Sequence, residues 1–106
     1  MKNVLFVCSQ NKLRSPTAEQ VFSSWPGIET SSAGTNNDAE NPLSHELVEW
    51  ADIIFVMERI HRAKLQSKYR AAMKNTRLIC LDIPDDYQFM DPRLVELLSA
   101  KVPRYL

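Results

Sequence analysis

Three short, unbroken apolar runs constrain the fold of this 106-residue chain more than any other feature. They are Val4 to Val7, Ile53 to Met57 and Leu78 to Leu81, and none alternates with polar residues. Continuous apolar runs of this length are typical of strands that are buried on both faces in a parallel sheet. A fourth and weaker strand is predicted over Ile28 to Ala33, where polar residues interrupt the pattern.

Helical patterns fill the intervals between these runs. Apolar residues recur at helical spacing after Ser15-Pro16, from Ser44 to Ala51, from 58 to 73, and after Asp91-Pro92. Alternating strands and helices predict an α/β fold with a four-stranded parallel sheet flanked by helices, joined by right-handed crossovers. The length predicts a single domain over residues 1–106. In such sheets, the functional crevice lies beyond the carboxyl ends of the strands.

The charge balance and the cysteine count exclude some classes of protein. Lys plus Arg and Asp plus Glu both number 13, so we expect no nucleic acid partner, and any anion site must be local. The chain has only two cysteines, too few for a disulfide framework, and its apolar N-terminal run is too short for a signal peptide. We therefore expect a cytoplasmic protein with no membrane partner. No cluster of His, Cys and Asp has metal-ligand spacing, so no metal is predicted.

The segment VCSQNKLRSPTAE, residues 7 to 19, carries the clearest chemistry. Cys8 ends the first apolar run, Arg14 follows six positions later, and Ser15-Pro16 is typical of a helix start. A loop that enters a helix N-terminus can direct several backbone N–H groups at one anion, and the helix dipole adds positive potential. Arg14 can offer two parallel hydrogen bonds to phosphate oxygens. A cysteine in this field ionises readily, and its thiolate can attack a bound phosphorus in line.

These residues resemble the signature of the low-molecular-weight protein tyrosine phosphatases, here in a shortened variant. The likeness continues in the same order through SAGT at 32–35, ADIIFVM at 51–57 and LDIPDDY at 81–87. The resemblance implies that Cys8 is the nucleophile and that Arg14 holds the phosphate, without a cofactor. It also implies that Asn11 braces the loop, that Ser15 supports the thiolate, and that Ser32 belongs to a hydrogen-bond network beneath it. The predicted phosphate-binding residues are Ser9, Gln10, Asn11, Lys12, Leu13, Arg14 and Ser15.

Four departures from the family pattern bear on the site. Gln10 stands where the family usually has glycine, which is costly if that position needs unusual dihedral angles. Lys12 replaces a commonly apolar residue of the pocket wall, which favours a substrate other than an ordinary phosphotyrosine. Leu13 stands where many members have a second cysteine. The segment between SAGT and ADIIFVM is also shorter than is usual in the family, which is expected to open the pocket or change its wall.

A general acid is needed to protonate the leaving oxygen. The family's acidic loop matches IPDDY, with Asp85 as the acid, Asp86 in the position of the family's proline, and Tyr87 as a ring beside the substrate. Asp91 also precedes a proline, but Asp-Pro at this position favours a helix cap. Asp85 is the first candidate, and Asp86 and Asp91 remain open.

The second cysteine and the two histidines are not assigned to the active site. Cys80 is predicted to be a small buried apolar residue, and His45 and His61 are predicted to lie on the surface. The run ERIHRAK, residues 58 to 64, is interpreted as a solvated helix face.

The sequence thus predicts a cysteine-dependent phosphomonoester hydrolase of the tyrosine-phosphatase type. Its partner would be a phosphorylated protein or a small phosphate ester, with phosphotyrosine, phosphoarginine and small esters all open, as is the oligomeric state. One alternative is a phosphate-binding module without turnover. A weaker alternative is an arsenate reductase that uses Cys8 and Cys80.

Overall fold

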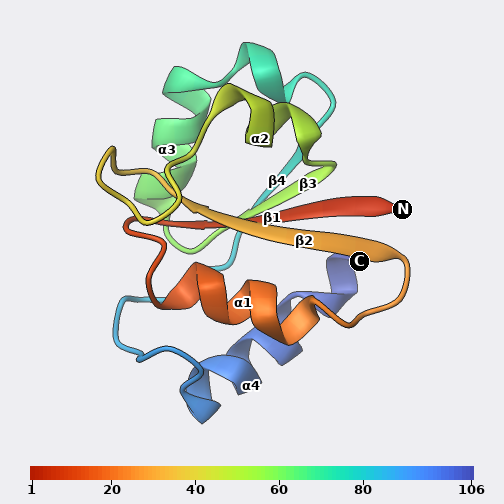
Figure 1. Cartoon of the computed structure of the whole chain (residues 1–106), viewed down its shortest axis with the longest axis vertical. Coiled ribbons are helices and arrows are strands. Elements are labelled where there is room, and N and C mark those ends of the chain that lie inside the picture. The colour runs from red at the N-terminus through yellow and green to blue at the C-terminus, as the bar shows by residue number, and fades with distance from the viewer.

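The central sheet has four parallel strands in the spatial order β2-β1-β3-β4, as the computed structural model of all 106 residues shows (Figure 1). The strands are β1 (Lys2–Cys8), β2 (Ile28–Gly34), β3 (Ile53–Val56) and β4 (Arg77–Cys80). The four strands predicted from the sequence are all present, and each agrees with its predicted range to within two residues. The apolar runs form the strands because their side chains can be buried on both faces.

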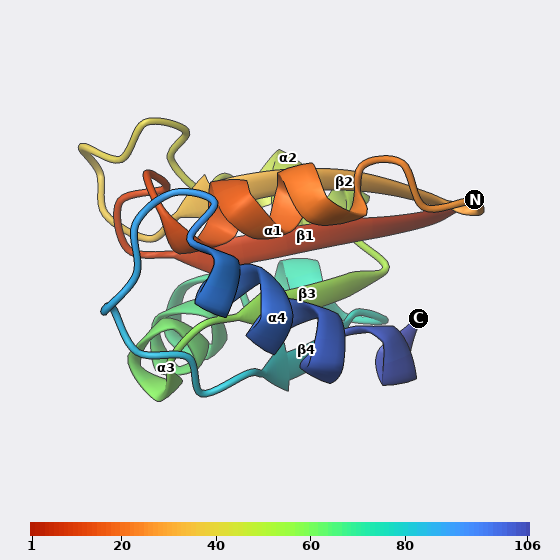
Figure 2. The same cartoon turned by 90° about the horizontal axis from the view of Figure 1, so that it is seen from below.

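Four helices cover the two faces of this sheet (Figures 1 and 2). Helices α1 (Arg14–Phe22) and α4 (Pro92–Lys101) lie on one face, and α2 (His45–Trp50) and α3 (Arg59–Lys68) lie on the other. Two short 3₁₀ turns, Ala71–Met73 and Pro103–Tyr105, follow α3 and α4. The predicted three-layer α/β fold is confirmed. None of the helices has the length and apolar character needed to cross a bilayer.

Alternate residues of β1 supply the cores on the two faces. Val4 and Phe6 point toward α1 and α4, and Leu5 and Val7 point toward α2 and α3, all with no exposed surface. The Phe6 ring stacks on Phe22 and on Phe55, with ring centroids 5.8 and 5.4 Å apart. Burying each such ring stabilises the fold by about 1.5–3 kcal/mol. The same alternation turns the side chain of Cys8 toward the α1 side.

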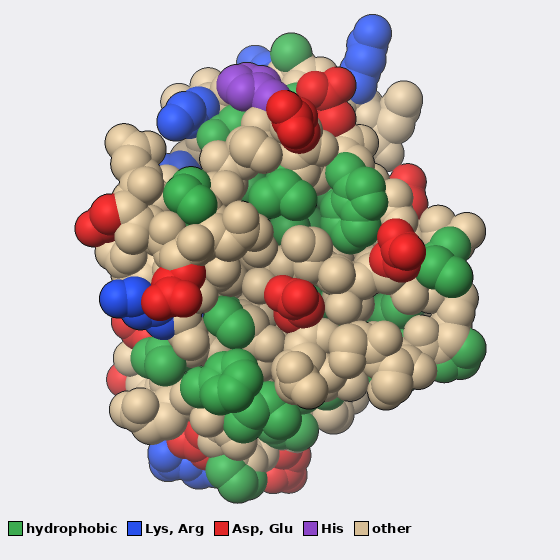
Figure 3. All heavy atoms as spheres, in the orientation of Figure 1, with side chains coloured by type: hydrophobic (Ala, Val, Ile, Leu, Met, Phe, Trp, Pro, Cys, Tyr) green, Lys and Arg blue, Asp and Glu red, His purple; other side chains and the backbone are tan.

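The order of the strands positions the site. From β1, the chain crosses to β2 on one side and later to β3 on the other, so the carboxyl end of β1 lies at a switch point where a crevice forms. Cys8, as predicted, is the last residue of β1 and lies beside Gly34 of β2. Acidic and basic side chains are mixed over the face seen in Figure 3, in keeping with the zero net charge.

Two details of the helices differ from the prediction. Helix α1 begins at Arg14, one residue before the predicted serine cap, and Leu13 occupies the cap position without a side-chain hydrogen bond. Helix α3 ends at Lys68, five residues before the end of its predicted range, and its Ile60 side chain is 57% exposed. Ser44 and Asp91 do cap their helices, because their side chains accept hydrogen bonds from Leu47 N–H and Arg93 N–H.

Candidate active site

The loop from Ser9 to Leu13 joins the end of β1 to the start of α1. Its backbone turns at Asn11, where φ is +58°, a left-handed conformation that asparagine adopts more readily than most residues. Gln10 has no positive φ, so the conformational cost expected for a residue in the glycine position is not incurred there. The loop therefore curls at Asn11 and brings Arg14 back toward Cys8.

The backbone N–H groups of residues 9 to 14 donate no hydrogen bond to any other group of the protein. Six successive backbone donors around one loop are therefore free to bind an acceptor from outside the chain. Successive N–H groups in a curled loop form a concave site for anions, and the N-terminus of α1 adds its dipole. The loop thus has the donors that a bound phosphate requires.

Cys8 is 3% exposed and lies at the floor of this loop. Its Sγ is 2.9 Å from the Oγ of Ser15, and Asn11 Nδ2 donates to the same Oγ at 2.9 Å. The carbonyl oxygen of Ala33 is a more distant partner for the Ser15 hydroxyl, at 3.4 Å. Because Asn11 occupies an acceptor position of the hydroxyl, its proton is free to point at sulfur. Asn11 and Ser15 therefore form a short hydrogen-bonded chain that ends at the Cys8 sulfur.

Arg14 is anchored on one side and free on the other. Its Nη1 donates to Glu58 Oε2 and to the carbonyl oxygen of Ile83, both at 2.8 Å, and the side chain is only 3% exposed. Neither Nη2 nor Nε makes a hydrogen bond within the protein, although Asp85 Oδ1 lies 3.7 Å from Nε. The free Nε–Nη2 edge is the one that can bind two phosphate oxygens in parallel.

Asp85 is the only one of the candidate acids that reaches the loop. A cavity of about 140 Å³ is lined by Asp85 together with Cys8, Ser9, Gln10, Lys12, Leu13 and Arg14. Asp86 does not line it, and the Asp91 side chain accepts from the backbone N–H of Arg93 at the start of α4. Hydrogen bonds from Arg93 hold the pKa of Asp91 below its ordinary value, so this carboxyl group is poorly suited to donate a proton.

The segment 35–43 closes against the outer side of the loop. Backbone N–H groups of Thr35, Asn36 and Glu40 donate to the carbonyl oxygens of Cys8, Ser9 and Gln10 at 2.9–3.0 Å. At Gly34, an added Cβ would come within 2.5 Å of the Ser9 carbonyl oxygen and of the Ala39 Cβ. Only glycine allows this close approach. The short segment thus supports the loop from Ser9 to Leu13 directly.

His61 contributes to the loop from α3. It has no exposed surface, so the predicted surface location is wrong. Its Nδ1 accepts from Glu58 N–H at 3.1 Å, which leaves Nε2–H to donate to Ser9 Oγ at 2.9 Å. Burial, aided by the positive charge of Arg14, lowers the pKa of His61 to about 4, so the ring is neutral at physiological pH.

Ser32 and Tyr87 do not line the cavity at Cys8. The hydroxyl of Ser32 donates to Glu19 of α1, and its carbonyl oxygen accepts from Asn41 Nδ2 at 2.7 Å. Tyr87 packs against the core on the α1 side, with the Arg93 guanidinium 5.5 Å from the centre of its ring. Tyr87 does not line the cavity at Cys8, and its expected contact with a substrate ring stays a prediction.

Cys80 is partly exposed at the end of β4 rather than fully buried, and its Sγ lies 3.6 Å from Asp82 Oδ1. Strand β3 separates β4 from β1, so two strand spacings of about 4.8 Å separate this thiol from Cys8. A disulfide needs Cα atoms within about 7 Å. The two cysteines therefore cannot pair without a rearrangement of the sheet.

Sequence reasoning missed three supports of the loop, namely Glu58, His61 and the Ile83 carbonyl group. The solvated-face interpretation of residues 58 to 64 is wrong for Glu58 and His61, which turn inward at the start of α3. The available signal was their position directly after the buried strand β3, which places them at the same sheet edge as Cys8.

Comparisons with known proteins agree with this fold. A sequence model described as low molecular weight phosphotyrosine protein phosphatase matches residues 3–52, just under half of the chain. A search of curated protein sequences found no match to this chain. Among solved structures, a low molecular weight protein tyrosine phosphatase from T. tengcongensis is 23% identical, with a TM-score of 0.77 over 100% of both chains.

Two further structures have the same fold. Wzb from Vibrio vulnificus, in complex with benzylphosphonate, is 22% identical, with a TM-score of 0.78 over 98% of this chain and 96% of its own. The YwlE arginine phosphatase from Geobacillus stearothermophilus is 22% identical, with a TM-score of 0.75 over 93% of this chain and 89% of its own.

Proposed function

We infer that this chain, which has the fold of the low-molecular-weight protein tyrosine phosphatases and matches the family's sequence model over residues 3–52, is a cysteine-dependent phosphomonoester hydrolase. Residues 1–106 would form one such domain. The observation that carries this function is a run of six backbone N–H groups without a protein partner, together with the unbonded edge of Arg14, in a loop that lines one cavity with Cys8.

The reaction follows from the placement of the groups. The phosphoryl group sits in the loop, where the N–H groups and Arg14 bind its equatorial oxygens and stabilise the charge of the transition state. The Cys8 thiolate forms a bond to phosphorus as the bond to the leaving oxygen breaks. Asp85 gives its proton to that oxygen. Water then attacks the cysteinyl phosphate, Asp85 takes a proton from the water, and inorganic phosphate and the thiolate are released.

The neutral His61 and the donor chain through Ser15 are positioning groups in this scheme. His61 holds the Ser9 hydroxyl, and Asn11 orients the Ser15 hydroxyl toward sulfur. These contacts fix the loop before substrate arrives, so no reorganisation is needed as charge develops.

The substrate class is a phosphorylated protein or a small phosphate ester, and phosphotyrosine and phosphoarginine are both candidates. The solved relatives include one in complex with benzylphosphonate and one described as an arginine phosphatase. Lys12 is exposed and lines the cavity, which favours a substrate with a second negative group near the phosphoester. We also propose a reducing, cytoplasmic location, because the nucleophile must stay a free thiol and both cysteines are free.

The test is hydrolysis of an aryl phosphate by the wild-type protein and by Cys8→Ser. We expect turnover to fall below detection in this variant, while vanadate and phosphate still bind, because the loop donors are unchanged. Cys80→Ser is the matched control and should keep the wild-type rate. If Cys8→Ser hydrolyses the ester at the original rate, the mechanism is wrong.

The two other functions considered are not favoured. A binding module without turnover would hold vanadate but hydrolyse no phosphate ester, even as the wild-type protein. An arsenate reductase would need a thiol relay between Cys8 and Cys80, which the intervening strand β3 opposes.

A further inference from the structure

A second and larger cavity lies between α3 and the segment 35–43. Its volume is about 410 Å³, against about 140 Å³ for the cavity at Cys8, and the two share no lining residue. Cavities of about 300 Å³ and above are of the size that holds small organic ligands. The mechanism proposed above uses none of its side chains.

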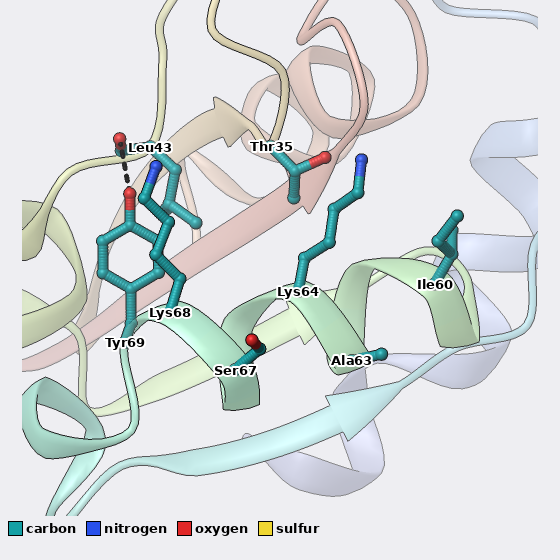
Figure 4. A pocket seen from close by; sticks show the side chains of 8 residues that line it. All are labelled: Thr35, Leu43, Ile60, Ala63, Lys64, Ser67, Lys68 and Tyr69. Carbon is teal, nitrogen blue, oxygen red and sulfur yellow. Dashed lines mark hydrogen bonds between the residues drawn. The ribbon is translucent and has the colours of Figure 1, made fainter.

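The walls of this cavity are partly apolar and partly basic (Figure 4). Leu43, Ile60 and Tyr69 supply apolar surface, and the Tyr69 hydroxyl is already engaged as a donor to the Leu43 carbonyl oxygen at 3.1 Å. Lys64 and Lys68, one turn apart on α3, extend from the same side of the helix in Figure 4, Lys64 toward Thr35 and Lys68 beside Leu43 and Tyr69. No Asp or Glu lines it.

The two lysines lack the acidic partners found elsewhere on the molecule. Arg14 and Arg93 pair with carboxylates, but neither Lys64 nor Lys68 forms an ion pair. Lys64 Nζ has only a 3.4 Å hydrogen bond to Asn36 Oδ1, and Lys68 Nζ lies 5.6 Å from the centre of the Tyr69 ring. Two unpaired ammonium groups thus gather at one cavity of a chain with zero net charge.

Thr35 adds an unsatisfied polar group to the same wall. Its Oγ1 is shielded from solvent and has no hydrogen-bond partner in the protein. In Figure 4 this hydroxyl points toward the ammonium end of Lys64. A shielded hydroxyl without a partner is unfavourable, so an acceptor bound beside Lys64 would satisfy both groups once the Thr35 side chain turns toward the cavity.

We propose that this cavity binds a small aromatic anion. Its sulfonate, carboxylate or phosphate group lies between Lys64 and the Thr35 hydroxyl, and its ring lies on Leu43 and Tyr69 beside Lys68. The occupant would touch Thr35, whose N–H donates to the Cys8 carbonyl oxygen at 2.9 Å. This cavity is therefore next to the start of the loop at residues 9–13, but it is separate from the cavity at Cys8.

The test is an NMR titration of the ¹⁵N-labelled full chain with naphthalene-2-sulfonate, with the Cys8 loop saturated by vanadate. We expect saturable shifts of the amides of Thr35, Leu43 and Ser67, with a dissociation constant of about 1 mM or below. The double variant Lys64→Gln/Lys68→Gln should bind roughly 5- to 30-fold more weakly. Thr35→Val should also weaken binding, because it removes the hydroxyl and keeps the shape.

The matched control is Lys74→Gln/Arg104→Gln, which makes the same change of charge at two exposed positions away from the cavity. It should bind the sulfonate as the wild type does. Shifts confined to residues 8–14 and Asp85, absence of saturable binding, or equal weakening by both double variants would overturn the proposal. Because the vanadate-loaded protein is used and no turnover is measured, the result is independent of whether the chain is a phosphatase.

Discussion

At the scale of single residues, the proposed chemistry depends on which atoms are left free. Asn11 takes the left-handed turn of the loop and also donates to Ser15, so one residue sets both the path of the backbone and the direction of the hydroxyl. Arg14 uses Nη1 for its anchors and keeps the opposite edge for an anion. Asp85, by contrast, is largely exposed and is positioned mainly by its approach to Arg14.

The first prediction concerns Asp85. Asp85→Asn should lower kcat about 10²- to 10⁴-fold for an ester with a poor leaving group, and far less for p-nitrophenyl phosphate, whose leaving group needs little protonation. The decrease of kcat at high pH should also be absent in Asp85→Asn. The measurement is a pH–rate profile of both substrates.

Asp86→Asn is the matched control, since Asp86 does not line the cavity. Asp86→Asn should keep both the wild-type kcat and the wild-type pH–rate profile. Retention of the high-pH limb in Asp85→Asn, with its loss in Asp86→Asn, would transfer the role of the acid to Asp86.

The second prediction concerns the anchor of Arg14. Glu58→Gln keeps the shape but weakens the 2.8 Å bond to Arg14 Nη1, and the guanidinium then has one fewer fixed contact. A hydrogen bond between charged groups contributes about 1.5–3 kcal/mol, so kcat/KM for an aryl phosphate should fall roughly 10- to 100-fold.

Glu96→Gln is the control, because Glu96 lies exposed on α4 and makes no ion pair. Isothermal titration with phosphate should show the same loss of affinity in Glu58→Gln alone. Unchanged phosphate affinity there would mean that Arg14 is held well enough by the Ile83 carbonyl group.

At the scale of elements, the start of α3 supports the loop at two points. Glu58 and His61 are joined by a hydrogen bond from Glu58 N–H to Nδ1, and they reach Arg14 and Ser9 respectively. Because both are fixed by one helix start, a shift of α3 would disturb the anchor and the Ser9 hydroxyl together. The α1 N-terminus and the start of α3 therefore both bear on the proposed anion site, α1 through its dipole and α3 through its contacts with Ser9 and Arg14.

The third prediction is a pH dependence of stability from His61. In the unfolded chain, His61 takes up a proton below its ordinary pKa of 6.5, whereas the folded protein keeps the ring neutral down to about pH 4. The unfolded state then binds more protons, so stability falls as the pH drops from 6.5 to 4. The full loss is up to about 3 kcal/mol. Urea unfolding at pH 7.5, 5.5 and 4.5 measures it.

His61→Gln cannot titrate, so its stability should fall less over the same interval, while His45→Gln should behave as the wild type. His45 is the suitable control because it is the only other histidine and lies exposed on α2. If the free energy of unfolding falls equally in His61→Gln and in the wild type, the pH dependence belongs to carboxyl groups instead.

The elements also show what the sequence could and could not predict. The strands, the position of Cys8 and the cap at Asp91 depend on local pattern, and all are confirmed. Glu58 and His61 were misjudged because charged neighbours surround them in sequence, while their partners Arg14 and Ser9 lie 44 and 52 residues away. Long-range contacts of this kind leave no periodic signal, and only the common edge of the strands brings them together.

At the scale of the whole molecule, the strand order decides which side chains can meet. Residues at the ends of β1 and β3 share the switch point, where Cys8, Glu58 and His61 gather. The end of β4 lies one strand farther out, with Cys80 in register with Val56 of β3. The loop after β4 still returns to the site, because it carries Ile83 and Asp85 back over β3 to Arg14.

The last prediction follows from this separation of the two thiols. Peroxide should abolish the proposed phosphatase activity through Cys8 alone, and peptide mapping under non-reducing conditions should find no Cys8–Cys80 disulfide, because two strand spacings exceed the reach of the bond. Cys80→Ala should lose activity at the wild-type rate, and a dithiol should restore both proteins if oxidation has stopped at the sulfenic acid. A Cys8–Cys80 peptide in the oxidised wild type would mean that the sheet opens between β1 and β4, and the thiol relay of an arsenate reductase would then be physically accessible.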